Sequence, residues 1–325
     1  PVLPLRSRAC IVGGILAGRA PARGSSRVPL RTLIGGGRTS SWSSQQQSGN
    51  LLVATDVALA VLLLSGSGLL IRSLRALLSR DLGFERQVAT AEITLSTERY
   101  RSDPAGRLAY WDGLANAFRS IPGVEAVGIG NWVPLGFGGS TFIDVEGHDG
   151  PATGAAYRAV NEDYFQALAI PFLKGRGFDR EDSPGAARTA IVSRRLAEQY
   201  WPGQNPIGRR IRATSMESGS NGGAVPWLTV VGVVADVRHW GLESEAEPTI
   251  YVSFRQVPQM TYGMTATIRT PLDTLRLFRL LADRAHSLDP SIAVSLGTLD
   301  QRQRDLLIPR RLTASLLTGF ATLAL

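Results

Sequence analysis

The chain has 325 residues, of which 44% are hydrophobic, and this composition is typical of a folded protein rather than a disordered one. Its formal net charge of +8 lies almost entirely in residues 1–50, which contain seven arginines and no acidic residue. The rest of the chain is nearly neutral, which argues against a basic nucleic-acid-binding domain. The single cysteine, Cys10, cannot form a disulfide within the chain.

The first long apolar segment, Leu51–Ile71, reads LLVATDVALAVLLLSGSGLLI and predicts a transmembrane helix over residues 51–73. About 20 such residues cross a hydrocarbon core of about 30 Å. A buried helix of a soluble protein is the alternative, but the polar stripe that such a helix normally has is missing. Asp56 is interpreted as an interfacial carboxylate rather than a proton or ion site. The positive-inside rule places the arginine-rich residues 1–50 in the cytoplasm and the residues after the helix outside.

Residues 72–82 continue a helical pattern, and Gly83 is a stop signal for it. Residues 74–87 are predicted to form a stalk. A strand is then predicted over residues 88–96, because apolar and polar residues alternate there. The apolar residues of this pattern are Ala89, Ala91, Ile93 and Leu95.

A helix is predicted to follow, with Asp103 as its N-cap and Pro104 in its first position. Pro122 and Gly123 would end it before a strand over residues 124–129. The predicted apolar face of the helix consists of Leu108, Trp111, Ala115, Phe118 and Ile121.

The same strand, helix and strand recur nearer the C-terminus. Residues 264–268 alternate as a strand, residues 270–273 open a helix, and residues 292–296 form the last strand. The expected apolar face of this second helix consists of Leu275, Phe278, Leu281, Ala285 and Leu288. Because each helix has one apolar stripe, the pattern predicts a single sheet with both helices on one face, the split ferredoxin-like arrangement.

Residues 131–257 interrupt this unit with short strands and glycine-rich turns, which predicts an inserted β-rich subdomain containing a mobile loop over residues 216–223. After a second stalk over residues 301–311, an apolar run over residues 312–325 predicts the start of a second transmembrane helix. We therefore expect a fragment of a longer protein. The predicted strands of the insertion are 141–145, 189–193, 227–234 and 249–254.

We find no catalytic, cofactor-binding or metal-binding constellation in the sequence. The only lysine, Lys174, lacks the glycine loop that an ATPase needs to hold phosphates. The three histidines are far apart and lack metal-ligand spacing. Two acidic clusters are interpreted as solvated rather than as general acids or calcium ligands. These groups are His148, His239 and His286, the pair Glu181 and Asp182, and the series Glu243, Glu245 and Glu247.

Four blocks stand out in the insertion: RAVNEDYFQALAIPFLKGRGFDRED (158–182), TAIVSRRLAEQYWPGQNPIGRRIR (189–212), LTVVGVVADVRHWGL (228–242) and PTIYVSF (248–254). They resemble a known family, the MacB-type ABC transporter permeases and their FtsX-like relatives. The resemblance covers nearly the whole chain, and residues 18–38 are similar to the loop joining the two halves of the duplicated permeases of acidobacteria. It implies that residues 11–17 are the remnant of an earlier span.

The resemblance implies an α+β membrane protein whose MacB-like periplasmic domain is a porter-like unit split by the inserted subdomain. It implies a bacterial inner-membrane permease that moves with a separate ABC ATPase subunit, and a second permease half or homodimer partner, a periplasmic adaptor and lipid as further partners. Helix-end turns at Gly83 and Pro309 would then control coupling. The expected organisation is 1–50 cytoplasmic, 51–73 membrane, 74–87 stalk, 88–130 and 258–300 porter-like unit, 131–257 inserted unit, 301–311 stalk and 312–325 membrane.

Two other functions predict different features from those of an exporter. A non-transporting scaffold that regulates an envelope enzyme predicts an exposed apolar patch on the inserted unit, whereas a porter predicts a cleft between the two units. A membrane-anchored enzyme would require Glu181, Asp182 and His239 to meet in one pocket.

Overall fold

The structure is a computed structural model that describes residues 82–323 except 96, 137, 149, 184, 215–224 and 240–243, together with scattered residues between 54 and 76. The described residues of the predicted span 51–73 are helical, whereas Cys10, Asp56 and the predicted mobile loop lie outside the described part. Within that described part, no helix combines the length and the apolar character needed to cross a bilayer.

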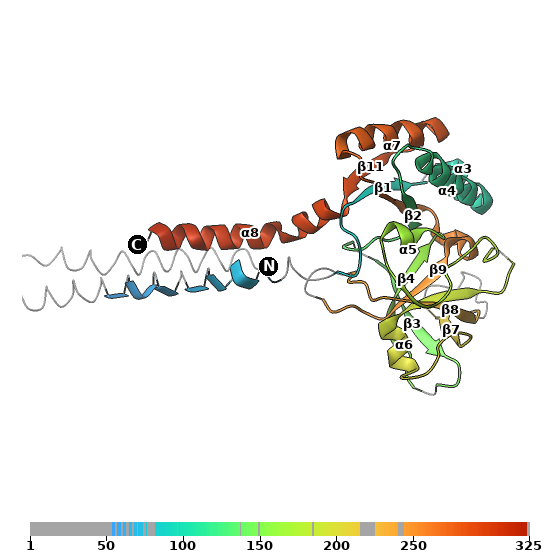
Figure 1. Ribbon diagram of the computed structural model, residues 1–325, viewed down its shortest axis with the longest axis horizontal. Coiled ribbons are helices and arrows are strands. Elements are labelled where there is room, and N and C mark those ends of the chain that lie inside the picture. Colours follow the sequence, from blue (N-terminus) through green and yellow to red (C-terminus); the bar gives the residue numbers. More distant parts are fainter. Residues whose placement is uncertain are drawn as a thin grey trace, which may run out of the picture. The chain divides into compact units, whose positions relative to one another are not determined.

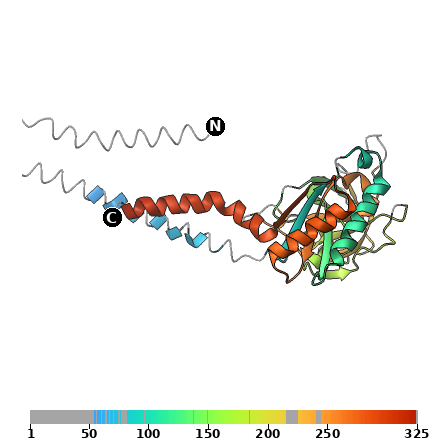
Figure 2. The ribbon, with the colours of Figure 1, turned by 90° about the horizontal axis from the view of Figure 1, so that it is seen from above.

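The porter-like unit forms a four-stranded antiparallel sheet in the order β11-β1-β10-β2. Helices α4 and α7 pack against each other, and both views show them side by side over these strands (Figures 1 and 2). This is the split ferredoxin-like arrangement predicted from the sequence. Its elements are β1 (Val88–Thr94), α3 (Glu98–Arg101), α4 (Pro104–Arg119), β2 (Ala126–Gly130), β10 (Gly263–Arg269), α7 (Thr274–Leu288) and β11 (Val294–Thr298).

Helix α4 begins as its sequence predicts. Asp103 caps it by accepting a hydrogen bond from the Gly106 amide at 2.8 Å, and Pro104 occupies its first position. Trp111 is fully buried, and its indole N–H donates to the Thr261 carbonyl at 2.8 Å. The buried face also includes Leu114, which was not predicted, whereas Leu108 is only half-buried.

The face that α7 buries differs from the predicted one. Leu277, Leu281 and Ala285 are its buried residues, whereas Leu275 is 75% exposed and Leu288 is 40% exposed. Leucines occur on more than one side of this helix, so several apolar stripes fit a 3.6-residue period. Only packing against the sheet and α4 selects the buried stripe.

The inserted unit contains the four predicted strands and three that were not predicted, β4, β5 and β7. Strand β4 does not alternate because both of its faces are buried along most of its length. The elements are β3 (Ser140–Val145), β4 (Thr153–Val160), α5 (Tyr164–Ala167), β5 (Phe172–Gly175), β6 (Thr189–Ser193), α6 (Arg194–Tyr200), β7 (Arg210–Ala213), β8 (Leu228–Val234), β9 (Thr249–Ser253) and η2 (Phe254–Gln256). The short helix η3 (Pro258–Met260) follows the insertion.

The two units share one sheet rather than forming separate sheets. The connection is narrow, because β2 and β4 are paired only at Gly130 and Val160. A main apolar core lies between the porter-like sheet and its helices and continues into the inserted unit.

A second apolar core joins the segment before β1 to the first turns of the last helix, α8 (Leu299–Leu323). Leu299 and Leu307 of α8 are buried in this core together with Leu82 and Phe84. Pro309 lies inside α8, so the predicted helix-end turn at this residue is wrong. A proline removes one backbone hydrogen bond, and a long helix can continue past that loss with a kink.

Candidate functional site

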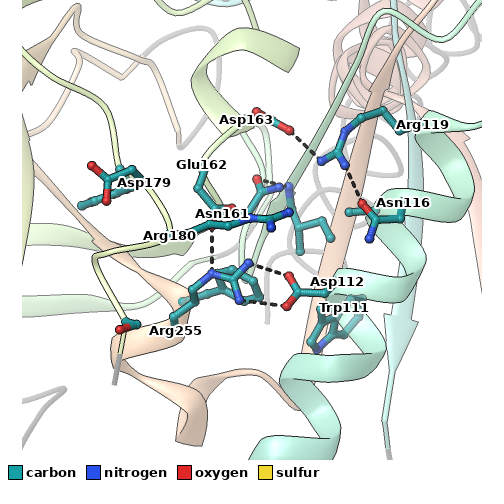
Figure 3. A pocket seen from close by; sticks show the side chains of 15 residues that line it. Trp111, Asp112, Asn116, Arg119, Asn161, Glu162, Asp163, Asp179, Arg180 and Arg255 are labelled. Atoms are coloured by element: carbon teal, nitrogen blue, oxygen red, sulfur yellow. Dashed lines mark hydrogen bonds and ion pairs between the residues drawn. The ribbon is translucent and has the colours of Figure 1, made fainter. Parts of the chain in front are cut away.

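A cleft of about 780 Å³ lies between α4 of the porter-like unit and loops of the inserted unit (Figure 3). Strands β4 and β9 run parallel and are paired to their ends at Val160 and Ser253. Because parallel strands end at the same edge of a sheet, the residues after them lie side by side along one wall of the cleft. We call this space the α4 cleft.

The opposite wall is a polar stripe on α4. Asp112, Asn116 and Arg119 occupy positions i, i+4 and i+7, so they share one helix face. Trp111 and Ala115 lie beside them and form part of the cleft lining.

Arg255 joins the two walls. Its guanidinium makes a bidentate contact with Asp112, at 2.6 and 2.8 Å, and a third hydrogen bond to Glu162 at 2.8 Å (Figure 3). The Arg255 side chain is 15% exposed. The hydrogen bond to Asp112, reinforced by Glu162, raises the pKa of Arg255 against the opposing effect of burial. Arg255 is therefore a charged bridge that remains cationic.

A second bridge crosses the cleft at Arg119. Its guanidinium contacts Asp163 at 2.7 Å and Asn116 at 2.8 Å (Figure 3). Arg180 and Asp179 complete the charged lining, and Asp179 pairs with Arg176 at 3.1 Å. The positive and negative groups are closely balanced, so the cleft does not select a ligand of one charge.

Glu181, Asp182 and His239, which the enzyme alternative requires in one pocket, line none of the described pockets. Asp182 is buried and binds Arg176 at 2.8 Å and Thr189 at 2.8 Å. Burial would raise the pKa of Asp182, but hydrogen bonds from Arg176, the Asp179 amide and Thr189 lower it overall. Glu181 is exposed, and neither it nor Asp182 nor His239 lines the α4 cleft.

The described members of the second acidic series, Glu245 and Glu247, belong to no group that could hold a metal ion. Glu245 is exposed and pairs with Arg195 at 2.9 Å, and Glu243 lies outside the described residues. Across the described ranges, no three acidic, histidine or cysteine side chains form a group that could hold a metal ion.

His239 is buried, and its Nε2 lies 3.3 Å from the Tyr251 hydroxyl. Burial, helped by the nearby Arg158 charge, holds the pKa of His239 well below its usual range. The unfolded imidazole protonates near pH 6.5. We therefore expect stability to be fully retained above that pH and to fall by up to about 1.4 kcal/mol per pH unit below it, until the folded pKa is reached.

Denaturant unfolding between pH 5 and 7.5 measures this effect. His239→Gln should flatten the pH dependence, whereas His148→Gln, at an exposed histidine, should leave it as in the unchanged protein. Identical slopes for all three proteins would contradict a role for His239.

Sequence reasoning missed the residues that build the α4 cleft. The polar positions of α4 carried a signal, since they repeat with helical spacing beside the apolar face. Their partners come from loops far away in the chain, and only the pairing of β4 with β9 brings those loops together. The missed residues are Asp112, Arg119, Glu162, Asp163 and Arg255.

The sequence profile of the MacB-like periplasmic core domain matches residues 51–296. The chain belongs to this family. MacB-like domains are typical of ABC transporter permeases, where they form the periplasmic or extracellular part and are typically non-catalytic. No curated protein matches this MacB-like chain in sequence.

Three of the solved structures that are similar to this chain are the following. The periplasmic region of MacB from Actinobacillus actinomycetemcomitans is 14% identical, with 71% of this chain and 97% of that chain covered and a TM-score of 0.46. A permease-protein domain from Porphyromonas gingivalis is 16% identical, with 65% and 90% covered and a TM-score of 0.41. The extracellular domain of the noncanonic ABC-type transporter YknZ from Gram-positive bacteria is 17% identical, with 64% and 99% covered and a TM-score of 0.40.

Proposed function

We propose that this chain is the permease subunit of a MacB-like ABC transporter in a bacterial inner membrane. A separate cytoplasmic ATPase subunit hydrolyses ATP, and the permease helices convert that motion into a change of the periplasmic domain that drives export. A second permease half or a second copy completes the unit, with lipid around its spans. The similarity of residues 18–38 to the linker of duplicated permeases supports placing this chain in the second half of such a protein.

The observation that carries this proposal is the packing of α8 into the second apolar core. Leu299 and Leu307 are buried with Leu82 and Phe84, which lie where the chain enters the domain before β1. Arg302 of α8 forms an ion pair with Glu92 of β1. The chain segments that enter and leave the domain therefore share one packed junction, and a packed helix transmits displacement as a rigid body.

The α4 cleft supports the same proposal. A cleft between the porter-like and inserted units is the feature expected of a porter, and its walls come from both units.

Affinity purification of the tagged full chain from its native membranes, with crosslinking, tests the proposal. We expect an ABC ATPase subunit to co-purify, with greater recovery in a non-hydrolysable ATP analogue than without nucleotide, because nucleotide-held ATPase dimers remain attached. An unrelated tagged inner-membrane protein, prepared in parallel, controls for carry-over. Failure to recover an ATPase under crosslinking would contradict the permease function.

A regulatory membrane scaffold is the second candidate, and one observation favours it. On the inserted unit, β5 exposes Phe172 to 41% and Leu173 to 44%, and β3 exposes Phe142 to 57%. Exposed apolar side chains on the inserted unit are the feature that the scaffold predicts, because a contiguous apolar patch marks a protein contact. Recovery of a periplasmic enzyme in place of the ATPase in the same purification would support the scaffold.

A further inference from the structure

The narrow connection between the two units depends on two asparagines. Strands β2 and β4 share a single paired position, at Gly130 and Val160. Beyond it, the Ile129 amide donates to the Asn161 side chain at 2.7 Å, and the Ala159 amide donates to the Asn131 side chain at 2.9 Å. The two side-chain oxygens therefore accept amide hydrogen bonds at the point where the regular strand pairing stops.

The backbone amides of the same two asparagines also donate hydrogen bonds across the connection, in a reciprocal pair. The Asn131 amide donates to the Ala159 carbonyl at 3.0 Å, and the Asn161 amide donates to the Ile129 carbonyl at 2.9 Å. Both asparagines are buried. A backbone connection of so few bonds lets a small number of residues absorb a rotation, whereas the apolar core that continues between the units and the packing of α5 against β2 keep that rotation small.

The α4 cleft opens beside this connection, since Ile129 and Asn161 line it. Two links cross it from α4 to the ends of the parallel strands. One runs from Asp112 through Arg255 to Glu162, and the other runs from Arg119 to Asp163. Widening of the cleft must break at least one bond in each link.

We propose that the inserted unit pivots about the Asn131 and Asn161 connection, and that the two links form an ion-pair latch that holds the α4 cleft in its narrow state. The latch consists of Asp112, Arg119, Glu162, Asp163 and Arg255. Opening exchanges the exposed Arg119–Asp163 pair for water contacts at little cost, whereas Arg255, which is 15% exposed and makes three hydrogen bonds, supplies the larger part of the latch. A bound partner or motion from the stalks that favours the open state would shift this equilibrium.

This inference goes beyond the permease function and needs neither ATP nor a partner subunit. Its test measures the distance between two spin labels by electron double resonance, on the full chain in detergent with Cys10→Ser. The labels are placed at Ala109→Cys on α4 and Glu198→Cys on α6, which are exposed positions on helices of the two units. Failure of this test would leave the ATPase purification unaffected.

We expect a single short-distance population in the otherwise unchanged chain. Arg119→Asp sets two carboxylates against each other at Asp163 and should add a population at longer distance. The exchanged pair, Arg119→Asp with Asp163→Arg, should restore the short distance, because the ion pair is rebuilt with reversed polarity. Adding Arg255→Gln to Arg119→Asp should increase the long-distance population further.

Arg210 and Glu146 provide a matched control, since they form a similarly exposed ion pair at 2.9 Å within the inserted unit. Arg210→Glu should leave the distance distribution unchanged. The latch is overturned if Arg119→Asp leaves the short population intact, if the exchanged pair stays at the long distance, or if Arg210→Glu opens the cleft equally.

Discussion

Replacing Trp111 by alanine should lower the free energy of unfolding by about 3–5 kcal/mol, the usual loss for a large aromatic side chain in a core. Trp111 is fully buried in α4, and its indole donates a hydrogen bond to the Thr261 carbonyl. The substitution leaves both a cavity and an unpaired carbonyl next to the α4 cleft. Melting followed by circular dichroism at about 222 nm should show a midpoint lower by roughly 10 °C.

Trp227→Ala is the control for this substitution. Trp227 is half-buried and stacks with Arg210 and Arg212, whose guanidinium carbons lie 5.5 and 4.8 Å from its ring centre. We expect its loss to cost about 1 kcal/mol or less, because exposed cation–π contacts are weak. Equal midpoints for the two variants would show that the core around α4 adapts to the cavity.

Gly83→Ala should lower the free energy of unfolding by about 3 kcal/mol or more, from backbone strain and steric overlap together. Gly83 has a φ of +80°, and a Cβ atom there would overlap the backbone carbonyl of Asp236. The neighbouring contact, a hydrogen bond from the Arg238 amide to the Leu82 carbonyl at 3.1 Å, lies in the same junction and should weaken as well.

Gly147→Ala is the control that measures backbone strain without steric overlap. The φ of Gly147 is +77°, but a Cβ atom there would meet nothing within 4 Å. Gly147→Ala should therefore lower the free energy of unfolding only by the strain of a left-handed residue, about 1–2 kcal/mol. Denaturant unfolding of both variants compares the two losses, and equal values would mean that the Asp236 carbonyl moves aside without penalty.

The strand and helix elements of the porter-like unit followed from local patterns. Alternation in residues 88–96 predicted β1, and the Asp103 cap with Pro104 predicted the start of α4. These signals are local, because a cap or an alternating strand depends on residues a few positions apart. The same reasoning failed at Pro309, where a breaker residue lies within a continuous helix.

Local patterns could not select the buried stripe of α7 or detect β4. Leu275 satisfied the helical period as well as Leu277 did, and only packing decided between them. Strand β4 carries the buried Arg158 and lacks alternation, so its sequence does not resemble a half-exposed strand. Burial on both faces removes the period on which strand prediction depends.

By itself, the sequence determined the split order of strands and helices, the inserted unit and the family resemblance, because caps, breakers and periodicity act over short distances. Only the tertiary structure decided the α4 cleft and its two charged links. Those links join α4 to residues that follow β4 and β9, and the parallel pairing of these strands brings them together. Long-range pairing of this kind leaves no pattern at the separate positions, since each arginine or carboxylate alone resembles a solvated surface charge.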